Sequence, residues 1–97
     1  MSQKSPKDSK LYKYIGSRIK TKRESLKITQ TVLGDCTGVT FQQIQKYEKA
    51  SNKVPIDRLL DISKRLEEPF SYFVPNDSDL AEYNTDSDVY RREPVGI

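Results

Sequence analysis

Apolar residues recur at helical spacing through the first three quarters of this 97-residue chain, and no segment carries a strong strand signal. The first apolar stripe holds Tyr12, Ile15, Ile19 and Leu26, and Arg23 falls inside it. Side chains at such spacing lie on one face of a helix. The pattern therefore predicts a first helix with a charged residue on its apolar face.

Two short helices joined by a tight turn are predicted next. Thr29 is a good N-cap for the first of them, and Gly38 suits the left-handed position that ends it. Thr40 is the N-cap of the second, and Gln43 completes a T-x-x-Q capping box. Two helices joined in this way are typical of a helix-turn-helix motif, expected here at about residues 30–49.

Within that motif, the positions where the two helices must touch hold small or apolar residues. Gly34 lies where the helices cross closely, and Thr37 stands where an apolar residue is usual, so its contact should be weaker. The apolar contacts are expected from Leu33, Val39, Ile44 and Tyr47.

A fourth helix is expected to start near Pro55, after a polar loop. The residues expected to point inward from it are Ile56, Leu59, Leu60 and Leu66. The stretch EPFSYFVP predicts a short fifth helix between Pro69 and Pro75. The expected fold is all-α with five helices.

Charge divides the chain unevenly. Residues 1–74 hold 15 Lys and Arg against 8 Asp and Glu, a balance of +7, whereas residues 75–97 hold 2 Arg against 6 Asp and Glu, a balance of −4. We expect a disordered basic arm at residues 1–10, one domain at 11–74 and an acidic tail at 75–97. A basic domain favours a polyanionic partner, although a lysine-rich solvated surface gives the same balance.

Composition argues against several classes of protein. The chain has one cysteine and no histidine, which removes internal disulfides, cysteine metal cages and the commonest general base. It has no apolar run long enough to span a membrane, and no secretory signal at its N-terminus. We expect a cytoplasmic protein with no cofactor, no metal and no enzymatic activity. Cys36 is expected to be a half-buried filler rather than a redox sensor.

An ordered set of motifs gives a family resemblance over residues 15–74. The set comprises R-I-K-x-x-R from Arg18, T-Q at Thr29, L-G-x-x-T-G-V-T from Leu33 and I-x-x-Y-E from Ile44. Together they resemble the phage-repressor-like (Cro/CI or XRE type) helix-turn-helix domain of bacteria. Ala50 departs from the pattern, since the family usually has glycine there. The resemblance implies a lambda-repressor-like fold and a sequence-specific transcriptional regulator of double-stranded DNA that is often a dimer.

The stretch TFQQIQKYEK is the candidate recognition helix. At about 100° per residue, Gln42 and Lys46 fall opposite the side that faces the core. Glutamine pairs bidentately with adenine and lysine suits guanine, so these two are the main candidates for reading bases. The full set of candidates is Thr40, Phe41, Gln42, Gln43 and Lys46. Thr40 and Gln43 can equally serve as a capping pair, and Phe41 can cover the rim of the core instead of touching a thymine methyl.

Two regions beside this helix are candidates for holding DNA phosphates. The first is the start of the preceding helix, where free N–H groups favour an anion, and the second is the loop after the recognition helix. The residues concerned are Thr29, Gln30, Lys49, Ser51, Asn52 and Lys53. The resemblance places both regions on the DNA backbone. Ser51 and Asn52 could also be simple turn formers.

Arg23 and Glu48 each lie on the buried stripe of their own helix, where an unpaired charge is costly. We expect them to form a structural ion pair with each other, as the family also does. A homodimer is expected through the fifth helix and the start of the tail, carried by Phe70, Tyr72, Phe73 and Val74. Phe70 and Phe73 could instead fill the base of the core. A protein-interaction module of the same fold, coactivator-like or antitoxin-like, is the alternative function.

Overall fold

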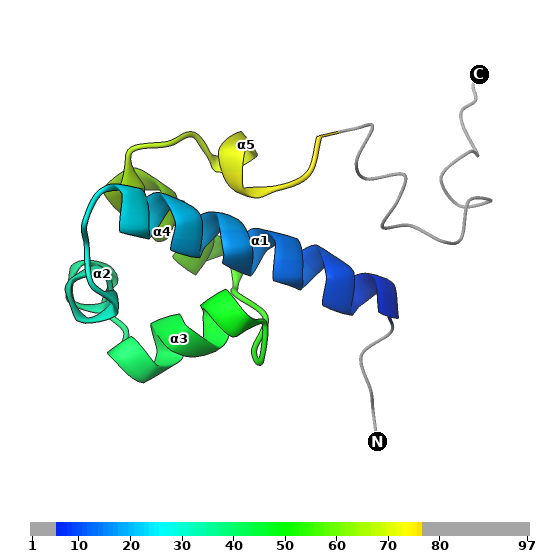
Figure 1. Cartoon of the computed structure of the whole chain (residues 1–97), viewed down its shortest axis with the longest axis horizontal. Coiled ribbons are helices and arrows are strands. Elements are labelled where there is room, and N and C mark those ends of the chain that lie inside the picture. Colours follow the sequence, from blue (N-terminus) through cyan, green and yellow to red (C-terminus); the bar gives the residue numbers. More distant parts are fainter. Residues whose placement is uncertain (1–5, 77–97) are drawn as a thin grey trace.

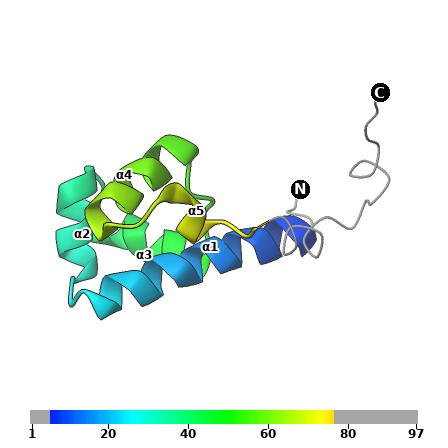
Figure 2. The same ribbon diagram turned by 90° about the horizontal axis from the view of Figure 1, so that it is seen from above.

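The computed structural model describes residues 6–76, and within that range the chain forms five α-helices and no strand. The helices are α1 (Pro6–Ser25), α2 (Gln30–Thr37), α3 (Phe41–Lys49), α4 (Ile56–Leu66) and α5 (Phe70–Phe73). Helix α1 runs the length of the domain, α2 and α3 pack together at one side of it, and α5 lies against it from another (Figure 1). Helix α4 lies behind α1 in Figure 1, and α5 packs against both of them (Figure 2). The all-α expectation with five helices is confirmed.

The described residues extend beyond both ends of the range expected for the domain. Helix α1 begins at Pro6, so the last five residues of the expected arm are helical, and residues 1–5 lie outside the described residues. Proline suits the first position of a helix, because the N–H that it lacks would have no intrahelical acceptor there. Pro75, expected to open the tail, is buried. Residues 77–97 lie outside the described residues.

The core draws on all five helices. Ile19 of α1, Leu33 of α2, Ile44 of α3 and Phe73 of α5 are fully buried. The rest of the buried apolar set is Ile15, Ile28, Tyr47, Val54, Leu59, Ile62 and Leu66. Since every helix contributes, α3 cannot move without disturbing contacts to its neighbours.

Helix α4 turns a different face inward from the one expected. Leu59 and Leu66 are buried as predicted, but Ile56 is 66% exposed and Leu60 46% exposed, so those two predictions are wrong. The buried stripe also takes in Ile62 and Ser63. A serine tolerates that position because its hydroxyl donates a hydrogen bond of 2.8 Å to the Leu60 carbonyl.

Helix α5 is held down from α1. The guanidinium of Arg18 lies 4.0 Å from the centre of the Tyr72 ring, and its Nε donates to the Tyr72 carbonyl at 3.0 Å. Lys22 pairs with Glu68 at 2.9 Å, just before α5, and this hydrogen bond raises the pKa of Lys22. Phe73 is in the core, so it is not part of an exposed surface as the dimer prediction required.

Candidate nucleic-acid interface

Helix α2 is capped at both of its ends. The Thr29 hydroxyl accepts from the Val32 N–H at 3.1 Å and caps the start of α2. Gly38 ends α2 with a φ of 79°, the left-handed conformation expected for it. Nη1 of Arg58, on α4, donates to the Thr37 carbonyl at 2.5 Å and so caps the last turn of α2. The caps at Thr29 and Gly38 were predicted, whereas the cap from Arg58 was not.

Two glycines allow the helices to approach closely. A Cβ atom on Gly34 would lie 2.5 Å from the Val39 carbonyl oxygen, and one on Gly16 would lie 2.6 Å from that of Glu48. Real Cβ atoms do not come so near backbone atoms, so a larger residue at either position would push α3 out of place. The role of Gly34 was predicted. That of Gly16 was missed, although a glycine inside a helical stripe is itself a signal of close packing.

A buried polar network joins α1, α2 and α3. Arg23 donates to the Glu48 carboxylate twice, from Nε at 2.6 Å and from Nη2 at 3.1 Å, and its Nη1 donates to the Ile28 carbonyl at 2.8 Å. The side-chain amide of Gln30 adds a bond of 3.0 Å to Glu48 Oε1. Arg23 and Glu48 are both buried, and the expected ion pair is present. Every charge in the network has a partner, as burial requires.

The outer side of α3 carries the residues considered for base reading. Gln42 and Lys46 are exposed, opposite the buried Ile44 and Tyr47. Phe41 is also exposed, at 40%. Thr40 precedes α3 as its N-cap, Phe41, Gln42 and Gln43 form the first turn, and Lys46 lies one turn further on. Helix α3 forms the lower edge of the domain in Figure 1.

Only one of the two hydrogen bonds of the predicted capping box between Thr40 and Gln43 is present. The Thr40 hydroxyl accepts from the Gln43 N–H at 3.1 Å, so Thr40 is a true N-cap. Among the hydrogen bonds of the described residues, none comes from the half-buried side chain of Gln43, so only half of the predicted capping box forms. The Gln43 amide therefore keeps its donors and acceptor for another partner.

The start of α2 offers two backbone donors. The N–H groups of Gln30 and Thr31 have no acceptor within residues 6–76, because the Thr29 side chain caps Val32 and the Thr29 carbonyl serves Leu33. The side-chain amide of Gln30, expected to contact a phosphate, donates to Glu48 in the structure. An anion at this helix end would meet backbone N–H groups and the positive end of the helix dipole.

The loop after α3 has an ordered backbone and an exposed surface. Ala50 leaves the helix with a φ of 62°, and the Ser51 N–H donates to the Lys46 carbonyl at 2.9 Å. The side chains of Lys49, Ser51, Asn52 and Lys53 are all exposed. Lys53 Nζ lies 5.5 Å from the centre of the Tyr12 ring, which ties this loop to α1. Four of the predicted phosphate contacts thus stand together at the C-terminal end of α3.

Other chemistry is sparse in the described part of the chain. Residues 6–76 contain no cluster of three or more His, Cys, Asp or Glu side chains that could hold a metal ion. No helix among them is long and apolar enough to cross a membrane. Cys36 is exposed rather than half-buried, and Arg65 Nε donates to its sulfur at 3.2 Å. The prediction of a half-buried filler was wrong because α4 approaches this part of α2 through a polar side chain.

These features define a helix-turn-helix domain, in which a short helix with an exposed polar face is held by a second helix across a glycine turn. A family model for this domain, HTH_3 (helix-turn-helix), matches residues 19–73, more than half of the chain. The chain belongs to that family. The lambda-repressor-like fold that the motifs implied is therefore confirmed.

Individual relatives agree with the family. An uncharacterized HTH-type transcriptional regulator of Sinorhizobium medicae is 50% identical over 60 residues, which are 62% of this chain and 43% of that protein. The chain thus spans less than half the length of this curated relative. The P22 c2 repressor, solved in complex with a synthetic operator, is 33% identical with a TM-score of 0.60, over 65% of this chain and 96% of the repressor. An HTH_3 family transcriptional regulator from Vibrio cholerae is 27% identical with a TM-score of 0.66, over 75% of this chain and 41% of that one.

Proposed function

We propose that this chain is a sequence-specific regulator of transcription that acts in the cytoplasm by inserting α3 into the major groove of double-stranded DNA. The observation that carries the proposal is the exposed face of α3, where Gln42 and Lys46 point away from a helix fixed by buried contacts on its other side. An α-helix fits the major groove, and a rigid helix loses little freedom on binding. The P22 c2 repressor, which has a similar fold, was solved in complex with an operator, and this similarity supports DNA binding by the present chain.

Gln42 is proposed to read an adenine, because its side-chain NH2 group can donate to N7 while its side-chain oxygen accepts from the N6 amino group. Lys46, one turn further on, is proposed to contact a guanine or a nearby phosphate. Thr40, Phe41 and Gln43 complete the proposed reading surface. The unbonded Gln43 amide supports a polar contact, and the partly exposed Phe41 ring supports an apolar contact with a thymine methyl.

Phosphate contacts are proposed on both sides of α3. At the start of α2, Thr29 and Gln30 frame two free backbone N–H groups that favour an anion. After α3, the proposed contacts are Lys49, Ser51, Asn52 and Lys53. Such contacts set the register of a protein on the duplex and carry the salt-dependent part of its affinity.

A homodimer is proposed as the binding unit. One short recognition helix covers only a few base pairs, which is too little to select one site in a genome. Since Phe73 is in the core, the proposed contact surface narrows to the half-buried Phe70, Tyr72 and Val74, with the start of the tail. The proposal assigns the chain no enzymatic activity, because nothing in the site supplies a nucleophile and base or a cofactor cradle.

The proposal is tested by selecting bound fragments from a pool of random duplexes and sequencing them. We expect enrichment of one near-palindromic sequence. The double variant Gln42→Ala with Lys46→Ala should lose that enrichment, whereas Gln45→Ala should keep it. Gln45 is an exposed glutamine of the same helix, about 100° round from the middle of the Gln42, Gln43 and Lys46 group. Absence of any enriched sequence would favour the protein-interaction module instead.

A further inference from the structure

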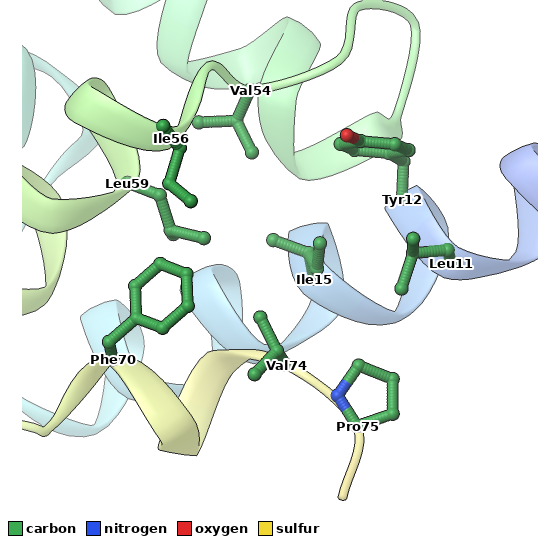
Figure 3. A pocket seen from close by; sticks show the side chains of 9 residues that line it. All are labelled: Leu11, Tyr12, Ile15, Val54, Ile56, Leu59, Phe70, Val74 and Pro75. Carbon is green, nitrogen blue, oxygen red and sulfur yellow. The ribbon is translucent and has the colours of Figure 1, made fainter. Parts of the chain in front are cut away.

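An apolar pocket of about 250 Å³ lies between α1, the start of α4 and the end of α5. Its side chains converge on one space from these three directions (Figure 3). The lining is Leu11, Tyr12, Ile15, Val54, Ile56, Leu59, Phe70, Val74 and Pro75, all apolar or aromatic. Ile56 is 66% exposed there, so the pocket leaves a large apolar side chain in water. An apolar pocket that is open to water is a candidate binding site for another apolar group.

We infer that this pocket receives the chain's own C-terminal segment, residues 77–97, through its first apolar side chains, Leu80 and Tyr83. Continuity of the chain supports this occupant, because Val74 and Pro75 form part of the wall and the segment follows one residue later. Four residues separate Pro75 from Leu80. An extended chain spans about 3.5 Å per residue, so this length is ample for turning back into a pocket that starts at Val74.

The charge of the segment agrees with the same occupant. Lys53 Nζ lies 5.5 Å from the centre of the Tyr12 ring, which places a cation beside the lining. Residues 77–97 hold six Asp and Glu against two Arg, so the net charge of the segment is opposite to that of the cation.

The test uses the full chain and does not depend on DNA binding. A nitroxide spin label is placed on Asn84→Cys in a Cys36→Ser background, and relaxation is measured at the methyl groups of Val54, Ile56 and Val74. We expect strong relaxation enhancement at all three. Because the segment is tethered next to the pocket, the deciding comparison is with the Leu80→Ser, Tyr83→Ser double variant, which should lose most of the enhancement. Enhancement unchanged in that variant would overturn the inference, since tethering alone would then explain it.

Two further arms identify the site and the donor of the segment. Ile56→Ser should reduce the enhancement at Val54 and Val74, whereas Leu60→Ser should not, because Leu60 is exposed on the same helix but does not line the pocket. Equal effects of the two changes would overturn the assignment to this pocket. When isotope-labelled chains without the nitroxide are mixed with spin-labelled unenriched chains, the enhancement should disappear. Enhancement that persists in the mixture would show that a second copy supplies the segment, and would overturn an occupant from the same chain.

Discussion

The side-chain amide of Gln30 donates to Oε1 of Glu48 at 3.0 Å, and Arg23 holds the same carboxylate from the other side. The first residue of α2 is thereby tied to the buried face of α3 and, through Arg23, to α1. Glu48 sits one residue after the buried Tyr47 and two after the exposed Lys46. The buried carboxylate of Glu48 therefore helps to fix the orientation of α3 relative to α1 and α2.

We predict that Glu48→Ala destabilises the fold by about 3–5 kcal/mol, because it leaves the Arg23 guanidinium buried without its counter-ion. In a double-mutant cycle, the combined change Arg23→Met with Glu48→Leu should cost less than the sum of Arg23→Met alone and Glu48→Leu alone, since no charge is then left buried without a partner. Urea denaturation of the four proteins in the cycle gives these free energies. Glu24→Ala is the control, because Glu24 lies 3.8 Å from Arg23 but is exposed, and it should cost under about 1 kcal/mol. Additive single changes would mean that the pair is not coupled.

The exit from α3 leads to a second stability prediction. Ala50 adopts a left-handed conformation that costs a residue with a Cβ about 1–2 kcal/mol, and glycine avoids most of this cost. Ala50→Gly should therefore stabilise the fold by about 1 kcal/mol after the added freedom of the unfolded chain is counted. The urea midpoint should rise with an unchanged slope. Ser51→Gly is the control, because Ser51 is not left-handed and should gain nothing from the change. A midpoint that falls for Ala50→Gly would show that the alanine methyl contributes more by packing than its backbone costs.

Local signals account for what could be predicted from the sequence. Caps at Thr29 and Thr40, the left-handed Gly38 and the close approach at Gly34 each depend on a few neighbouring residues of defined chemistry. The pairing of Arg23 with Glu48 followed from a different rule, since two opposite charges on buried stripes need each other.

Contacts between distant residues were not predictable in this way. Arg58 caps α2 from 21 residues away, and Arg18 holds the Tyr72 carbonyl from 54 residues away. Both guanidinium groups donate to backbone carbonyls. Because every residue has a backbone carbonyl, the sequence does not indicate which one each arginine will bond. The buried face of α4 was predicted incorrectly because a serine, such as Ser63, is usually exposed on a helix. In the structure Ser63 is buried, and its hydroxyl donates to the Leu60 carbonyl one turn earlier.

For base reading, we predict that Gln42→Ala costs about 1–3 kcal/mol at the selected operator and little on random duplexes. The amide is exposed on α3 and makes no bond within residues 6–76, so its removal should not disturb the fold. Fluorescence anisotropy with labelled duplexes measures both affinities, and Gln45→Ala serves as the matched control. Equal losses on operator and random DNA would reassign Gln42 to the general stability of the complex.

For phosphate contact, we predict that Lys53→Ala weakens operator and random DNA alike and lowers the slope of log affinity against log salt by about one unit. Tyr12→Leu should weaken binding less, because it removes the ring beneath Lys53 but keeps the charge. Lys64→Ala, an exposed lysine of α4 outside the proposed surface, should leave the slope unchanged. An unchanged slope for Lys53→Ala would remove this residue from the phosphate set.

The last prediction concerns assembly. Two copies related by a two-fold axis would place two α3 helices about 34–36 Å apart along one face of the duplex, which doubles the number of base pairs read. The surface proposed for this contact joins Tyr72 and Phe70 of α5 to the start of the tail, and a tail docked in the neighbouring pocket would form part of it. Sedimentation of the protein with saturating operator should give two protomers per duplex. Tyr72→Ser should lower that ratio, or raise the protein concentration at which it is reached. Leu26→Ser, at the half-buried residue that follows α1, should affect stability but not the ratio. One protomer per operator for the unaltered protein would contradict the dimer, and α5 would then serve only to close the core through Phe73.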